Sequence, residues 1–219
     1  LFNVAAPFQV GGCSDLVFKP KLGFRLFGGT HRGSHPKFRA TLTMPPGGSN
    51  IKSASVALPH SEFLDQGHIG TVCTRVQFKA EACPAASIYG TATAKTPLLD
   101  ETLTGNVYLR SSSHQLPDMV VALKGKIDAN VVGRVDSVNG GIRNTFDFVP
   151  DAPVQEFTLT LAGGKKGLLV NSRDLCSGTV PKATAKFSGQ NGDALTLRPP
   201  LKSACGKAKK QKRRARAKH

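Results

Sequence analysis

Hydrophobic and polar residues alternate through the middle of the chain, between residues 126 and 161. The first run sets small or apolar side chains at every second position: Ile127, Ala129, Val131, Gly133 and Val135. Two further alternating runs follow, around Phe146 and Leu159. Successive side chains of a strand point to opposite faces, so the pattern predicts three strands with one buried face. Asn139-Gly140 separates the first two runs and favours a tight hairpin turn, which predicts an antiparallel meander.

Shorter runs of the same kind recur along the rest of the chain. They cover 15–27 (with a bend near Pro20), 38–44, 51–58, 88–94, 103–110, 119–123, 168–170, 183–187 and 194–197. Only 61–66 predicts a helical turn, with Ser61 as its N-cap. Many short strands between turn residues are typical of a β-sandwich. We therefore predict an all-β fold, an antiparallel Ig-like β-sandwich over residues 1–205, built either as one sandwich or as two stacked modules that divide near 111–117.

The chain of 219 residues is long enough to bury a sizeable core. No stretch approaches the roughly 18–20 consecutive apolar residues of a transmembrane helix, so none is expected. The sequence opens at Leu1 rather than at Met, without the charged and apolar regions of a signal peptide. We expect a mature product or a fragment from which a signal peptide has been removed.

Five cysteines bear on the compartment. Zinc sites use close pairs such as Cys-x2-Cys, and the chain has none, so disulfides are the better interpretation. Cys73 and Cys83 flank a turn-prone loop, and Cys176 and Cys205 bracket a predicted terminal hairpin; other pairings stay open. Such bridges would stabilise the fold by about 2.5–4 kcal/mol each and indicate secretion or a cell-surface location. Cys13 is left over, either as a free buried thiol or with a partner in missing upstream sequence.

The formal net charge of +16 is unevenly distributed. Eight cations and no acid lie in 206–219: Lys207, Lys209, Lys210, Lys212, Arg213, Arg214, Arg216 and Lys218. This segment has no apolar side chain larger than alanine to offset the entropy cost of ordering, so we predict a disordered basic tail. Clustered Lys and Arg bind polyanions by releasing counterions, with little sequence selectivity. The absence of aromatic residues disfavours stacking on single-stranded bases.

Several short motifs occur between Cys83 and Gly192: CPAAS at 83–87, GTATA at 90–94, TPLL at 96–99, residues 105–109 and 116–118, VPDAP at 149–153, Asn171 with the LC pair at 175–176, and 190–192. Together they resemble a module of exported proteins of high-GC Gram-positive bacteria. It covers most of the chain from Cys13 to Cys205. The resemblance implies export and a sandwich-like build. No established activity accompanies this module, so no catalytic residue is carried over.

Two loops contain residues that could hold a ligand. His31 and His35 would share one face of a helix and could bind a metal there, but the surrounding Gly and Pro residues forbid a stable helix, and no acid or cysteine is nearby in the sequence. We therefore expect an exposed loop and no metal site. Gly163–Gly167 offers backbone N–H groups and two lysines to a phosphate. It lacks the P-loop spacing and does not open a helix, so a solvated turn is the better interpretation.

The sequence signals for a calcium site or a catalytic site are weaker still. Asp147, Asp151 and Asp174 lack the spacing of a calcium-binding loop. No Gly-x-Ser-x-Gly elbow marks a nucleophile, and nothing marks a pair of carboxylates for glycoside cleavage. We expect no enzyme, no cofactor and no metal.

The sequence thus favours a non-catalytic structural or interaction module that acts at the cell surface or in the extracellular space, alongside other modules of the same exported protein. The alternative is a polyanion-binding protein, for wall polymer, anionic lipid or DNA, that acts through the basic tail.

Overall fold

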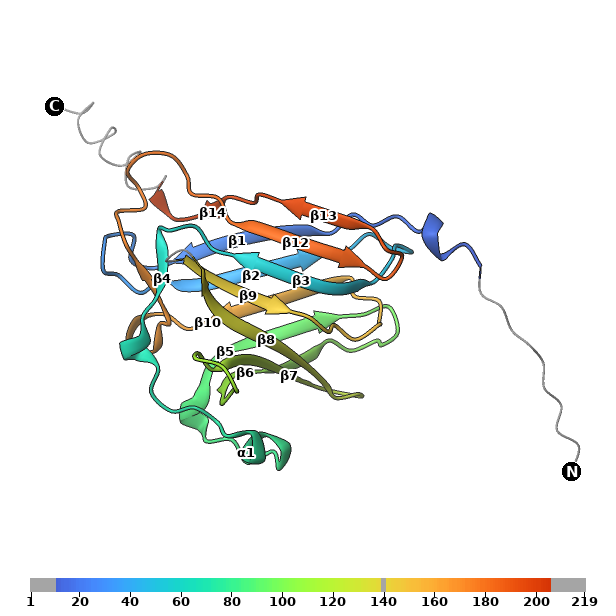
Figure 1. Ribbon diagram of the computed structural model, residues 1–219, viewed down its shortest axis with the longest axis horizontal. Coiled ribbons are helices and arrows are strands. Elements are labelled where there is room, and N and C mark those ends of the chain that lie inside the picture. The colour runs from blue at the N-terminus through green and yellow to red at the C-terminus, as the bar shows by residue number, and fades with distance from the viewer. Residues whose placement is uncertain (1–10, 139–140, 206–219) are drawn as a thin grey trace, which may run out of the picture.

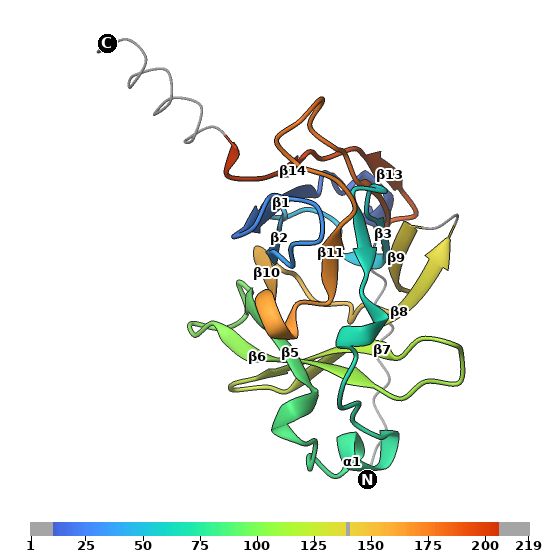
Figure 2. The same cartoon turned by 90° about the vertical axis from the view of Figure 1, so that its left-hand side faces the viewer.

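β-Strands dominate the computed structural model, which describes residues 11–138 and 141–205. Within them, twelve strands form one sheet in the order β13-β12-β3-β9-β8-β7-β6-β5-β10-β2-β1-β14, and β11 and β4 form a second, two-stranded sheet. Neighbouring strands of the large sheet run antiparallel except β1 and β14, which are parallel. Figures 1 and 2 show that this sheet curls on itself, so that β3 and β9 lie across from β2 and β10, while β4 and β11 lie at one end.

The bounds of the first seven strands are β1 Lys21–Phe27, β2 Lys37–Thr43, β3 Ile51–Ala57, β4 Glu62–Leu64, β5 Ile88–Lys95, β6 Leu103–Arg110 and β7 Asp118–Lys124. The other seven are β8 Ala129–Val138, β9 Gly141–Phe146, β10 Glu156–Leu161, β11 Leu169–Asn171, β12 Thr184–Gly189, β13 Ala194–Leu197 and β14 Leu201–Lys202. The large sheet contains most strands that the alternating pattern predicts, many with ends shifted by one or two residues. The prediction for 15–27 is correct only from Lys21 onward, because residues 16–20 form no strand.

The curled sheet has two halves, β14-β1-β2-β10-β5-β6-β7 and β9-β3-β12-β13, and strand β8 belongs to both. Its first half pairs with β7, where Gly133 is opposite Met119. From Arg134 onward it pairs with β9, where Arg134 is opposite Thr145. The sheet therefore turns from one half to the other within β8, and this single strand links the two halves.

The main core lies between these two halves. Most of its fully buried side chains come from the strands between β14 and β7, and Val135 comes from the second part of β8: Phe24, Leu26, Phe38, Val107, Val121, Leu123, Val135, Leu159, Leu161 and Leu201. The partly buried Val56 of β3 and Ile142 of β9 pack against them from the other half. They occupy the alternate positions of their strands, as the sequence pattern predicts. Burial of each large apolar side chain stabilises the fold by about 1.5–3 kcal/mol, so this shared cluster holds the curled sheet closed.

The predicted three-stranded meander is only partly correct. β8 and β9 form the predicted hairpin, with Val138 opposite Gly141, although the turn at 139–140 lies outside the described residues. β10 was expected beside β9, and it pairs instead with β2 and β5 in the other half. Its connection contains Pro150 and Pro153, which cannot donate to a strand ladder, so the chain crosses to the opposite half before pairing resumes.

The predicted helical turn at 61–66 is also wrong. Residues 62–64 form β4 and pair with β11. The capping residue is Asp65, whose carboxylate accepts a bond from the Gly67 N–H at the start of the short 3-10 helix Gln66–His68. Long-range pairing with β11 therefore overrides the local helical preference. A real helix, α1 Arg75–Lys79, begins instead at Thr74, which forms a capping box with Gln77.

The all-β class and the two disulfides, Cys73–Cys83 and Cys176–Cys205, are confirmed. The first bridge closes the segment that carries α1, and its buried Cys73 forms an isolated β-bridge with Arg110 at the end of β6. The second joins the chain after β11 to the chain after β14. Residues 111–117, where two modules were expected to divide, form the loop between the paired strands β6 and β7. The Ig-like sandwich stays a prediction.

None of the helices in the described residues has the length and apolar character required to cross a membrane. The basic tail at 206–219 and the expected disorder there lie outside the described residues, as does the side chain of Cys13.

Candidate functional site

The two histidines of the β1–β2 loop point to different partners. His31 is exposed, and its Nδ1 lies 3.1 Å from Asp174 Oδ2. His35 is more buried, and its Nε2 lies 2.7 Å from Asp65 Oδ2. Both aspartates come from segments that are distant in the sequence. For this reason the sequence alone shows no acid near the loop. The histidines therefore do not share a site with each other.

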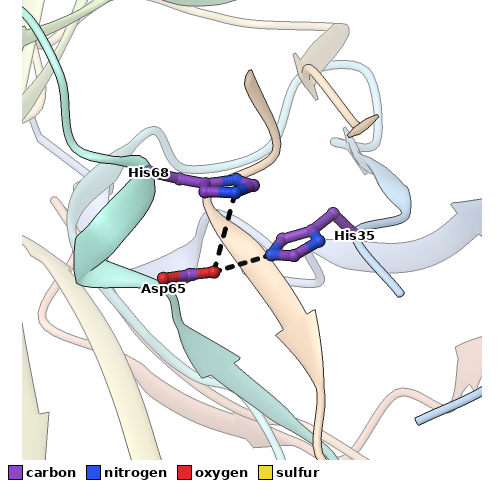
Figure 3. Close-up of side chains that lie close together, drawn as sticks. All are labelled: His35, Asp65 and His68. Atoms are coloured by element: carbon purple, nitrogen blue, oxygen red, sulfur yellow. Dashed lines mark hydrogen bonds and ion pairs between the residues drawn. The ribbon is translucent and has the colours of Figure 1, made fainter. Parts of the chain in front are cut away.

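His35 instead joins Asp65 and His68 in a compact cluster, shown in Figure 3. The rings of His35 and His68 are stacked, with centroids 4.1 Å apart. His68 Nε2 lies 3.8 Å from the same carboxylate oxygen that bonds His35. One potential ligand atom from each of the three residues lies within 4.8 Å of the other two. Two imidazoles and one carboxylate thus converge on a single point.

The glycine-rich turn at Gly163–Gly167 forms a wall of this cluster. Its Gly167 carbonyl lies 2.9 Å from His68 Nδ1, and its Gly164 N–H donates to the His35 carbonyl. A Cβ on Gly167 would lie 2.7 Å from the His35 Cβ, closer than side chains pack, so only glycine fits there. The turn that was considered as a phosphate cradle therefore supports the histidine cluster.

Asp65 carries the negative charge of the cluster. The hydrogen bond from His35 holds the pKa of the Asp65 carboxyl below its usual value, although partial burial opposes the shift. The Gly67 N–H and the nearby His68 lower this pKa further. The carboxylate is therefore ionised across the neutral range, and it faces two rings that can donate a proton or a lone pair.

A buried acid lies three residues before Asp65. The Glu62 side chain is fully buried on β4, and among the described residues neither carboxyl oxygen has a hydrogen-bond partner. Burial raises the pKa of Glu62 to about 8, and the adjacent Ser61 hydroxyl lowers it by less. Glu62 is therefore mainly protonated at neutral pH, which the sequence did not indicate.

The aspartates considered for calcium do not come together. Asp151 accepts a bond from Asn50, and Asp174 accepts bonds from His31 and the Cys176 N–H. Asp147 is exposed beyond the end of β9. Among the described residues, the histidine cluster is the only group of three potential metal ligands that lie together.

A second feature lies on the outer face of β14, β1 and β2. Lys202 of β14, Arg25 of β1 and Arg39 of β2 are direct neighbours on three successive strands, and all three are exposed. We call them the basic row. The guanidinium groups of Arg25 and Arg39 both lie over the ring of Phe27, each 5.1 Å from its centroid. One aromatic ring thus holds two like charges side by side.

Only a few Lys and Arg side chains among the described residues have a carboxylate partner, and the basic row is among those without one. Arg110 pairs with Asp118, Arg143 and Arg134 pair with Asp136, and Lys124 pairs with Glu81 and Asp128. In the described part of the chain, no carboxylate lies within ion-pair distance of Lys202, Arg25 or Arg39. Like charges directly opposite each other on neighbouring strands are destabilising, so this arrangement costs stability unless an anion is bound.

Hydroxyl groups continue the same face. Arg39 is opposite Thr160 on β10, which is opposite Thr91 on β5. The next row contains Thr41, Thr158, Thr93 and Thr104 on four successive strands. The sheet thus presents cations at one edge and rows of hydroxyl donors and acceptors beside them.

The predicted polyanion-binding residues Lys207, Lys209, Lys210, Lys212, Arg213, Arg214, Arg216 and Lys218 all lie outside the described residues. They follow Lys202 of the basic row closely in the sequence. Sequence reasoning missed Arg25 and Arg39, although both stand at polar positions of alternating runs, because which runs become neighbours is not visible locally.

No protein-family model, curated protein or solved structure matches this chain.

Proposed function

We propose that the protein is a non-catalytic interaction module that binds an anionic polymer across β14, β1 and β2. The observation that carries the proposal is the basic row. Its three cations are neighbours on adjacent strands, two of them (Arg25 and Arg39) share the Phe27 ring, and none has a carboxylate partner among the described residues. Neighbouring strands lie about 4.8 Å apart, so a chain of regularly spaced anions running across them can contact each cation in turn.

The chemistry of the neighbouring rows favours a polymer with both phosphate and hydroxyl groups. Arginine binds phosphate through paired N–H donors, and the threonine rows next to Arg39 offer hydrogen bonds to a polyol or sugar. The basic tail begins just after β14 and adds cations without aromatic stacking groups. An anionic wall polymer therefore fits this face better than a nucleic acid, whose bases would have no stacking partner in the tail.

The proposed setting is the cell surface or the extracellular space. Two disulfides support it, because such bridges persist in oxidising compartments. In this proposal the halves of the curled sheet pack as the layers of an antiparallel, Ig-like sandwich, and other modules of the same exported protein remain possible partners.

Binding to poly(glycerol phosphate) tests the proposal, with titrations at several salt concentrations. We expect the double variant Arg25→Ser/Arg39→Ser to bind at least 10-fold more weakly, and the slope of log K against log salt to fall by about 1.5–2, because each lost phosphate contact removes nearly one released counterion. The control Lys165→Ser/Lys166→Ser removes the same charge from the glycine-rich turn and is expected to bind like the native protein.

Deletion of 206–219 separates the strand face from the tail. The proposal expects the truncated protein to retain weaker binding that still depends on Arg25 and Arg39. If truncation abolished binding and the arginine variant kept native affinity, the tail would be the binding site instead of the basic row. Native affinity that does not vary with salt would overturn both.

A further inference from the structure

We propose that His35, Asp65 and His68 form a binding site for one divalent transition-metal ion of the zinc class, with Nε2 of each histidine and Oδ2 of the aspartate as ligands. This site is separate from the basic row, and the inference does not depend on the proposed function.

The three ligand atoms are already close to the required geometry. Asp65 Oδ2 lies 2.7 Å from His35 Nε2 and 3.8 Å from His68 Nε2. Zinc bonds to nitrogen and oxygen of about 2.0–2.2 Å place tetrahedral ligand atoms roughly 3.3–3.5 Å apart. The two distances lie on either side of this spacing, and the stacked rings must rotate before both Nε2 lone pairs can point at one ion.

Contacts behind the ligands set their orientation. If His68 Nδ1 carries the proton donated to the Gly167 carbonyl at 2.9 Å, the lone pair is on Nε2 and faces Asp65. The Gly67 N–H holds Asp65 Oδ1 at 3.0 Å, which leaves Oδ2 directed at the two rings. A carbonyl behind a histidine and a donor behind a carboxylate are the usual supports of metal ligands.

The donor set selects the class of ion. Two imidazoles suit zinc, copper, nickel, cobalt or iron, whereas calcium and magnesium prefer ligands that are all oxygen. The ligand side chains are 19%, 30% and 29% exposed, in the order His35, Asp65 and His68. Three protein ligands and partial exposure leave a fourth position for water or an external group.

The ion would also join segments that are distant in the sequence. His35 lies in the β1–β2 loop, while Asp65 and His68 follow β4, and the supporting Gly167 precedes β11. Binding to the folded state alone would raise the unfolding temperature in proportion to the logarithm of ion concentration above the dissociation constant.

The test uses the full chain, freed of metal with a chelator and titrated calorimetrically with zinc chloride and with cobalt chloride. We expect one ion per chain at this site, and at least 10-fold weaker binding in His35→Asn, Asp65→Asn and His68→Asn. His31→Asn is the matched control, because it removes a histidine with an aspartate partner from the same loop, and we expect it to bind like the native protein. Equal affinity in the native chain and in the cluster variants would overturn the site.

X-ray absorption of zinc bound to the native chain provides a measurement that needs no variant. We expect two imidazole ligands and oxygen in the remaining positions, with no sulfur. A spectrum with one imidazole or with sulfur ligands would overturn the proposal, as would the absence of binding at millimolar zinc.

Discussion

Glu62 and Asn171 lie directly opposite each other in the two-stranded sheet, and both side chains are buried. The Asn171 amide donates to the carbonyls of Gly29 and His31, while its own oxygen has no partner among the described residues. A protonated Glu62 has the O–H donor that this oxygen lacks. Asn171 thus holds the histidine-bearing loop, and the buried acid lies opposite it.

The first prediction concerns the pH dependence of stability. The folded-state pKa of Glu62 is about 8, above its ordinary value of 4.5, so the folded protein binds more protons than the unfolded chain between these two values. The contribution of Glu62 to the free energy of unfolding is therefore largest at low pH, and it falls by up to about 1.4 kcal/mol per pH unit until the pH passes 8. Urea denaturation at several pH values in this range measures the slope.

Glu62→Gln removes this titration, so the variant should show a flatter pH profile than the native protein. Glu101→Gln changes an exposed acid in the same way and should keep the native slope. An identical slope in native and Glu62→Gln proteins would show that Glu62 is ionised in the folded state.

Strand β6 requires a glycine at position 105. A Cβ there would meet the backbone carbonyl of Ala122 on β7, and backbone cannot rotate away as a side chain can. We expect Gly105→Ala to lower the free energy of unfolding by more than about 2 kcal/mol. Gly23→Ala on β1 is the control, because its Cβ would meet nothing within 4 Å, and it should be neutral or slightly stabilising. Similar chemical denaturation midpoints for the two variants would contradict the prediction.

The two disulfides should differ in their contribution to the free energy of unfolding. The Cys176–Cys205 bridge spans 29 residues and the Cys73–Cys83 bridge spans 10. Loop-closure entropy predicts that replacing the longer pair by alanine costs about 3.5 kcal/mol, against about 2.7 kcal/mol for the shorter pair. Thermal unfolding of the two double variants gives the order, and a larger loss from the shorter loop would show that packing of buried Cys73 outweighs chain entropy.

The basic row should make the unliganded protein sensitive to salt. Arg25 and Arg39 are opposite each other without a carboxylate partner among the described residues, so raising the salt concentration from about 0.01 M to about 1 M should screen their repulsion. We expect the stabilisation by salt to be smaller in Arg39→Thr than in Lys165→Thr, by on the order of 0.5 kcal/mol. Equal salt responses would mean that stacking on Phe27 already offsets the repulsion.

The alternating pattern predicted most strands well because the period of two is a local property. Partner choice is not local, which is why β10 was placed beside β9 instead of between β2 and β5. The same limit applies to the site. His35 stood out in the sequence, but its carboxylate partner lies 30 residues away, and the intervening strand β4 was mistaken for a helical turn. The Thr74–Gln77 capping box is a local signal for α1, but our sequence prediction missed it.

Because β8 supplies hydrogen bonds to β7 through one part of its length and to β9 through the other, neither layer can peel away from its neighbour on its own. Amide protons of β7 and β9 should consequently exchange with deuterated solvent at a common slow rate, through a single global opening. The domain should therefore behave mechanically as one body under load.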